Sequence, residues 1–220
     1  SSQTMQTSQH DHEGRAVAWL SFGVAGGLAL DLFAKEILQT YSLQEFVLIR
    51  SGIALAIFIA LAPRVFGGLT MLRTSRWRWH ALRSLLSIGA MFGFFYGLSK
   101  MPLVNTLTLA FTAPLMMTAL SVPFLGEHVG WHRWMAVIVG FIGTLIMLQP
   151  GNSDFNLASV AVLFAALCYA GHALTARHLA TSESTLALSV YVVAGPLIFS
   201  TAFLDKDSWL TPDAEGWALL

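Results

Sequence analysis

The feature that most constrains this chain is a series of long apolar stretches without a charged side chain. Such stretches occupy residues 101–126, 134–153, 155–176 and 184–204. A helix needs roughly 20 apolar residues to cross a bilayer, so each stretch has the length of a transmembrane helix. Helices are expected because lipid cannot satisfy open backbone groups, and the alternation of a membrane barrel strand is absent from the sequence.

Shorter charge-free runs reach the same length when a single charge is tolerated within the helix. The run 16–30 continues past Asp31, and the run 51–63 extends back past Arg50. The predicted fold class is therefore an all-α integral membrane protein, a bundle of about seven transmembrane helices. They are expected at residues 16–37, 43–62, 80–99, 103–125, 133–149, 157–177 and 186–204.

The composition excludes several other classes of protein. Charged residues make up 11% of the chain, against roughly 25% in ordinary soluble domains. Basic and acidic residues number 12 each, so no excess of positive charge favours a nucleic-acid partner. The single cysteine, Cys168, allows no internal disulfide and no multi-cysteine metal site. Phosphate-loop, dinucleotide, zinc-protease and serine-hydrolase motifs are absent, so we expect no enzyme activity, no cofactor and no metal.

The loop charges predict the orientation in the membrane. The segment between the second and third predicted helices carries four arginines and no acid, which places it in the cytoplasm by the positive-inside rule: Arg64, Arg73, Arg76 and Arg78. Two crossings precede this loop, so residues 1–15 are expected to form a cytoplasmic tail. The acidic segment after residue 204 is expected outside. The predicted location is the plasma (inner) membrane.

Asp31 and Arg50 are the most informative charged residues. They lie at similar distances on either side of the predicted turn near Thr40 and Tyr41, so an antiparallel hairpin places them at similar depth. Ionisable groups inside a membrane are costly and are usually paired or functional. They could form a buried pair or the charged floor of an outward cavity that binds or gates substrate. The alternatives are a purely structural pair, or Asp31 bonding Lys35 one helical turn away.

Glycines at intervals of four mark one face of the third predicted helix. Gly89, Gly93 and Gly97 form a small-residue face of the kind that allows close approach of membrane helices. This pattern predicts that the helix packs deep in the bundle. Tyr96 lies beside the face and could present its hydroxyl to a cavity, although a packed aromatic ring is the simpler reading.

A proline interrupts the fourth predicted helix. Pro114 removes a backbone hydrogen bond and favours a kink, which would expose carbonyls to a cavity. Asn105, Thr108 and Thr112 follow at spacings of three and four and share a stripe. That stripe could line a polar path for substrate or serve interhelical hydrogen bonding.

Two further groups stand out in the second half of the chain. Glu127, in the turn LGEHVGWHRW, is expected to cap a helix or to pair with Arg133 in a structural role. His172 lies inside an apolar run and could bind substrate or a proton, the alternative being a satisfied buried imidazole.

A weak internal repeat suggests the domain organisation. At an offset of 142 residues, AKEILQTYSLQ from Ala34 falls on ARHLATSESTL from Ala176, so the sixth predicted helix repeats the pattern of the first. Five helices per unit would invert the second unit in the membrane. We therefore predict a first unit at 16–151 and the beginning of a second at 152–220, and expect the chain to be part of a longer carrier.

Several segments together resemble the EamA-like branch of the drug/metabolite transporter superfamily. They are DLFAK at Asp31, FVLIRSG around Arg50, FGFFYGLSKMPLVNTLTLAFTAPLMMTAL, FLGEHVGWHRWMAVIVGFIGTLIMLQPG and ALCYAGHALTARHLA. The resemblance covers about residues 16–204. It implies two inverted five-helix units and transport of small metabolites such as amino acids, cofactor-like molecules or drugs. The DLFAK segment is similar to that of uptake carriers for S-adenosylmethionine or riboflavin.

The sequence thus predicts a secondary transporter that moves a small metabolite across the inner membrane by alternating access. The expected partners are the lipid bilayer and a small-molecule substrate, with proton or ion coupling and a homodimer left open. The alternative is a truncated paralogue that acts as a non-transporting scaffold or partner subunit.

Overall fold

The computed structural model describes residues 25–148, 156–205 and 209–210, and its described part is a bundle of helices. The predicted tail at 1–15, the Pro150–Gly151 segment and the chain beyond residue 210 lie outside the described residues. A first helix, called the N-terminal helix here, covers residues 25–40. It is followed by α2 (Leu43–Val65), the short 3₁₀ helix η1 (Leu69–Leu72), α3 (Trp77–Lys100), α4 (Leu103–Ala110), α5 (Thr112–Leu125), α6 (Trp131–Leu148), α7 (Leu157–Leu179) and α8 (Thr185–Ala202).

Five helical segments among the described residues are long and apolar enough to cross a membrane. They are α2, α3, the combined α4–α5 segment, α7 and α8, and α6 supplies a shorter apolar helix. The predicted all-α integral membrane bundle is thereby confirmed. Within the described residues each predicted span is occupied by helix, and the span 103–125 is divided into α4 and α5.

Local sequence signals account for the tight turn between the N-terminal helix and α2. Ser42 caps α2: its Oγ accepts a hydrogen bond from the Glu45 backbone N–H at 3.3 Å. The Glu45 carboxylate accepts one in return from the Ser42 N–H at 3.1 Å. This reciprocal capping box satisfies two backbone donors at the helix start. The capping box thus fixes where α2 begins, directly after the turn between Asp31 and Arg50.

The predicted interruption of the fourth helix divides it into α4 and α5. Phe111 joins the two pieces with ψ of −5°, far from the helical value near −42°. Pro114 follows three positions later and has no N–H to offer the carbonyl of Ala110. Two threonine hydroxyls near the break donate to carbonyls of the preceding turn, Thr112 to Leu109 at 2.7 Å and Thr118 to Pro114 at 3.0 Å.

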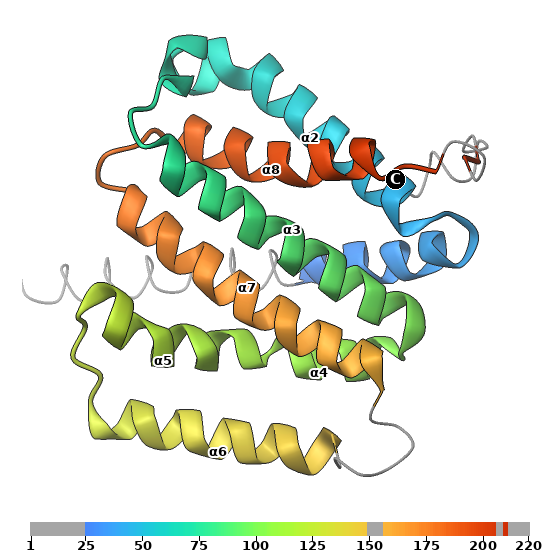
Figure 1. Cartoon of the computed structure of the whole chain (residues 1–220), viewed down its shortest axis with the longest axis vertical. Coiled ribbons are helices and arrows are strands. Elements are labelled where there is room, and N and C mark those ends of the chain that lie inside the picture. Colours follow the sequence, from blue (N-terminus) through green and yellow to red (C-terminus); the bar gives the residue numbers. More distant parts are fainter. Residues whose placement is uncertain (1–24, 149–155, 206–208, 211–220) are drawn as a thin grey trace, which may run out of the picture.

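The helices lie side by side in the order α2, α8, α3, α7, α5 and α6 (Figure 1). The most extensive contact joins α3 and α7, which form the centre of the bundle, while α6 packs mainly on α5 at one edge. The α2–α3, α5–α6 and α7–α8 connections all lie on the left side of Figure 1. We call this the arginine-rich end, after Arg64, Arg73, Arg76 and Arg78.

The three glycines of α3 face α7 directly. A Cβ at Gly89 would lie 2.7 Å from Cys168 Sγ, and one at Gly93 would lie 2.6 Å from the carbonyl oxygen of Ala161. A Cβ at Gly97 would overlap Val162. The absence of side chains at these positions therefore lets the two central helices approach to backbone contact.

Candidate functional site

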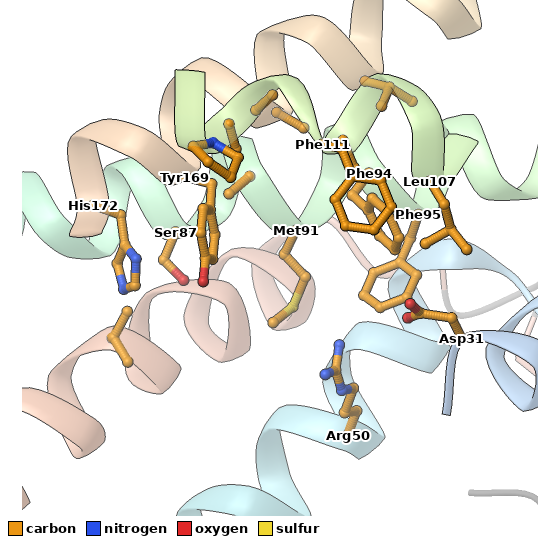
Figure 2. A pocket seen from close by; sticks show the side chains of 18 of the residues that line it. Asp31, Arg50, Ser87, Met91, Phe94, Phe95, Leu107, Phe111, Tyr169 and His172 are labelled. Atoms are coloured by element: carbon orange, nitrogen blue, oxygen red, sulfur yellow. The ribbon is translucent and has the colours of Figure 1, made fainter. Parts of the chain in front are cut away.

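A cavity of ≈ 570 Å³ lies in the middle of the bundle. This volume lies within the range of small-molecule binding sites, roughly 300–1,000 Å³. Most of its wall comes from α3, α4, α5, α7 and α8, and the N-terminal helix and α2 contribute one side chain each. Figure 2 shows its principal residues, which are Asp31, Arg50, Ser87, Met91, Phe94, Phe95, Leu107, Phe111, Tyr169 and His172.

One end of the cavity is charged, and it contains the predicted pair Asp31 and Arg50. Arg50 is exposed, and its guanidinium carbon lies 5.0 Å from the ring centroid of Phe95, a cation–π distance. Within the described residues no ion pair within 4.0 Å joins Arg50 to Asp31. Both also line a smaller cavity of ≈ 50 Å³ beside the larger one. Asp31 and Arg50 therefore line the same cavity without a direct ion pair.

Lys35 bonds the end of α3 rather than Asp31, the partner that the sequence offered as an alternative. Its ammonium group donates to the carbonyl oxygens of Leu98 at 2.9 Å and Met101 at 2.7 Å. These carbonyls lie at the end of α3, where the helix leaves acceptors without partners. Lys35 thus fastens the N-terminal helix to α3 and leaves the Asp31 carboxylate facing the cavity.

The middle of the cavity is apolar and aromatic. Phe94 and Phe95 come from α3, Phe111 from the junction of α4 and α5, and Met91 and Leu107 complete the wall. Aromatic faces and a thioether give favourable contacts with a flat ring system. This part of the wall suits a flat, weakly polar ring.

The other end of the cavity is polar, with Ser87, Tyr169 and His172. His172 Nε2 lies 3.2 Å from the Arg83 guanidinium. A guanidinium only donates hydrogen bonds, so Nε2 accepts and the ring proton resides on Nδ1. His172 is therefore neutral here, with a buried Nδ1–H that has no partner among the described residues.

Three predicted substrate-path residues of the fourth predicted helix do not line this cavity. Thr108 and Thr112 donate their hydroxyls to carbonyls one turn back, at Val104 and Leu109, and Asn105 is exposed on the same helix. The face of α4–α5 that meets the cavity carries Leu107, Ala110, Phe111, Ala113 and Pro114 instead.

Tyr96 also lies outside the cavity. Its ring packs against the buried cluster of Met101, Leu109 and Val162. Tyr96 is therefore a packed aromatic ring, and its hydroxyl does not line the cavity.

Glu127 is paired, but its partner differs from the predicted one. Its carboxylate forms an ion pair with Arg177 of α7 at the arginine-rich end, whereas Arg133 is exposed. Arg177 is distant in sequence, and only the packing of α5 against α7 brings it close. The side chains of the pair are 36% and 51% exposed, so the bond lies at the surface.

Several cavity residues were not identified from the sequence. On α3, Ser87, Met91 and Phe94 follow at helical spacing beside the glycine face, and on α7 Tyr169 precedes His172 by three positions. Both patterns place side chains on one helical face. These patterns identify cavity residues only once it is known that α3 and α7 meet at the glycine face.

Comparisons with known proteins agree with this architecture. The sequence profile of the EamA-like transporter family matches residues 17–149. The chain is 30% identical over 207 residues to an S-adenosylmethionine uptake transporter of Rickettsia bellii, covering 93% of this chain and 69% of the relative. It is 32% identical over 220 residues to a riboflavin transporter of Vibrio cholerae, covering 95% and 71%. It is 24% identical over 198 residues to the pseudopaline exporter CntI of Pseudomonas aeruginosa, covering 87% and 66%. The family match spans more than half of the chain and the relatives agree with it, so this multi-pass membrane protein belongs to the EamA-like transporter family.

Proposed function

We propose that the chain forms a secondary carrier for a small metabolite that combines a flat heteroaromatic ring with charged or polar groups. The observation that carries this proposal is the ≈ 570 Å³ cavity, with an aromatic middle and polar groups at both ends. The Phe94 and Phe111 rings would stack on the heterocycle, Arg50 would attract an anionic group and Asp31 a cationic one. S-adenosylmethionine and riboflavin, named for two relatives, both contain such a ring.

The proposed mechanism is alternating access around this cavity. Residues 16–151 would form one unit and the chain from residue 152 the start of an inverted second unit. In support, α3 of the first unit and α7 of the second pack at the glycine face, and both line the cavity. A site between two units that rock against each other can open to either side of the membrane in turn.

The proposed orientation puts the arginine-rich end in the cytoplasm. Arg64, Arg73, Arg76 and Arg78 support it through the positive-inside rule, and the N-terminus would then also be cytoplasmic. Asp31 and Arg50 would face the outer side of the plasma membrane. The relatives' names include both an uptake transporter and an exporter, so the direction of flux is a separate matter for measurement.

The test is transport by the purified chain in liposomes. Radiolabelled S-adenosylmethionine and riboflavin would be offered outside, with empty liposomes as the control. Saturable accumulation of at least one compound, recovered chemically unchanged, is the expected result. Accumulation no faster than in empty liposomes for both would contradict the proposal and favour the scaffold alternative, and recovery of a modified compound would indicate an enzyme.

A further inference from the structure

We propose that a largely buried polar cluster closes the cavity at the arginine-rich end and acts as its gate. The cluster, called the polar seal, consists of His80, Arg83, His172, Glu183 and Tyr191. This inference rests on the proposed alternating-access function. It names the contacts that must break for the cavity to open on that side.

The polar seal lies between the cavity and the arginine-rich end, as the order of residues along α3 and α8 indicates. On α3, His80 and Arg83 precede the cavity residue Ser87 at helical spacing. On α8, the carbonyl of Leu188 lies one turn before the cavity residue Val192. The same helices therefore line the cavity and meet in the seal.

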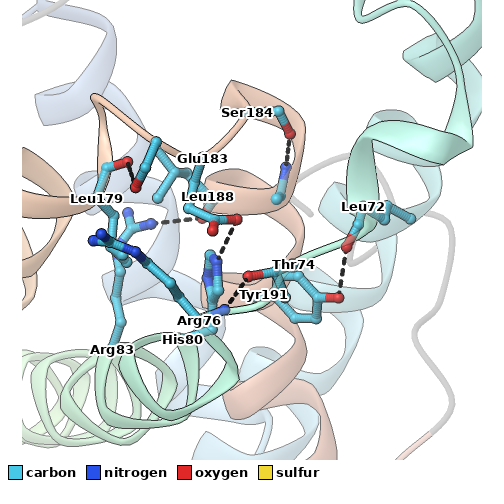
Figure 3. Close-up of polar contacts among 12 residues, drawn as sticks. Leu72, Thr74, Arg76, His80, Arg83, Leu179, Glu183, Ser184, Leu188 and Tyr191 are labelled. Atoms are coloured by element: carbon cyan, nitrogen blue, oxygen red, sulfur yellow. Dashed lines mark hydrogen bonds and ion pairs between the residues drawn. The ribbon is translucent and has the colours of Figure 1, made fainter.

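Two contacts hold α3 to the α7–α8 turn and to α8. His80 Nε2 lies 3.2 Å from a Glu183 carboxylate oxygen, and the two side chains are only 3% and 6% exposed. Arg83 donates to the carbonyl oxygen of Leu188 at 2.8 Å. Figure 3 shows these contacts together. A carboxylate and a guanidinium at this depth are held by their partners rather than by water.

Tyr191 extends the seal to the α2–α3 connection. Its hydroxyl donates to the Leu72 carbonyl oxygen at 2.9 Å, and its ring centroid lies 4.6 Å from that of His80. The Ser84 hydroxyl donates to the Tyr191 carbonyl, and the Ser184 hydroxyl donates to the Met71 carbonyl at 2.6 Å. The seal thus connects three segments that are far apart in the sequence (Figure 3).

The seal contains polar atoms that the closed state leaves without partners. Five buried side-chain polar atoms among the described residues make no hydrogen bond, and three belong to the seal: His80 Nδ1, Arg83 Nε and His172 Nδ1. An unsatisfied buried group costs free energy that water would recover on opening. The contacts that close the seal are therefore offset by groups that favour its opening, as a two-state gate requires.

His172 belongs to both the cavity and the seal. Its ring lines the cavity, while its Nε2 accepts from Arg83, which also bonds α8. A ligand that draws the imidazole toward the cavity removes one of the two partners of Arg83. Occupancy of the cavity is thereby linked to the strength of the seal.

The test measures access to the cavity and does not depend on flux. In a chain with Cys168→Ser, the substitution Ser87→Cys places one thiol in the cavity next to the seal. A membrane-impermeant thiosulfonate reagent is added to the arginine-rich side of membrane vesicles of known orientation. Glu183→Ala is expected to raise the labelling rate about tenfold, because one hydrogen bond to a charged group changes an opening equilibrium by roughly that factor.

Two further variants make the result specific. Glu127→Ala breaks the exposed ion pair at the same end and is expected to leave labelling unchanged. Tyr191→Phe removes only the hydroxyl that bonds Leu72 and is expected to increase labelling while the protein stays folded. Equal rates in the parent, Glu183→Ala and Tyr191→Phe would overturn the seal. Increased labelling without transport in liposomes would instead contradict the carrier function and retain the seal.

Discussion

Gly97 of α3 lies directly against Val162 of α7, with no room for a side-chain atom at position 97. Val162 also forms part of the cavity wall. Close packing of the two central helices and the width of the cavity are therefore set by the same contact. The glycine face does more than bring two helices together, because it also fixes the position of a wall residue.

Gly97→Ala is expected to lower the stability of the bundle by about 1–3 kcal/mol, the usual cost of overpacking a well-packed interior. Thermal unfolding of the purified protein in detergent measures the change. Gly143→Ala is the matched control, since a Cβ at Gly143 meets no atom within 4 Å. Equal melting temperatures for the two variants would show that the α3–α7 contact is looser than described.

Much of the fold follows from the sequence for simple physical reasons. A membrane helix must be long and apolar, so the charge-free runs 155–176 and 184–204 locate α7 and α8 to within a few residues. Pro114 cannot donate a backbone hydrogen bond, so the break before it is also predictable. Asp31 and Arg50 lie at one end of the cavity because a short hairpin fixes their depth.

Arg50→Ala is expected to abolish transport while the protein still reaches the membrane, because the charged end would lose the one arginine or lysine among the described residues that line the cavity. Arg50→Lys should retain partial activity, since a point charge replaces a planar guanidinium over the Phe95 ring. Uptake and membrane abundance are measured in the same cells. Arg64→Ala, which changes an exposed arginine on the same helix, is the control. Normal transport by Arg50→Ala would remove Arg50 from the site.

Phe94→Leu is expected to weaken binding of a ring-containing ligand about threefold to tenfold, because stacking on an aromatic face contributes about 0.5–1.5 kcal/mol beyond apolar contact. The half-saturation concentration for transport measures this change. Phe124→Leu alters an exposed aromatic of α5 that does not line the cavity and should have no effect. An unchanged half-saturation concentration in Phe94→Leu would indicate that the ligand does not stack there.

The remaining features of the site could not be read from the sequence because they depend on which helices meet. Thr108 and Thr112 look available on a helical stripe, yet a buried or lipid-facing hydroxyl satisfies itself on the preceding turn. Glu127 has Arg133 nearby in sequence, but the packing of α5 against α7 presents Arg177. Tyr169 lines the cavity and Arg83 bonds α8 only because α3 packs against α7 and α8.

Lys35→Met is expected to destabilise the protein by about 2 kcal/mol, because it removes two hydrogen bonds from a charged donor to the carbonyls of Leu98 and Met101. Those carbonyls would be left at the end of α3 without their partner, and the N-terminal helix that carries Asp31 would lose its anchor. Thermal unfolding in detergent measures the loss. Lys100→Met is the matched control, since it removes the same charge from an exposed position in the last turn of α3 and should change stability by less than about 1 kcal/mol. If both variants unfold at the same temperature, the Lys35 bonds do not hold the N-terminal helix, and the position of Asp31 at the cavity must depend on apolar packing alone.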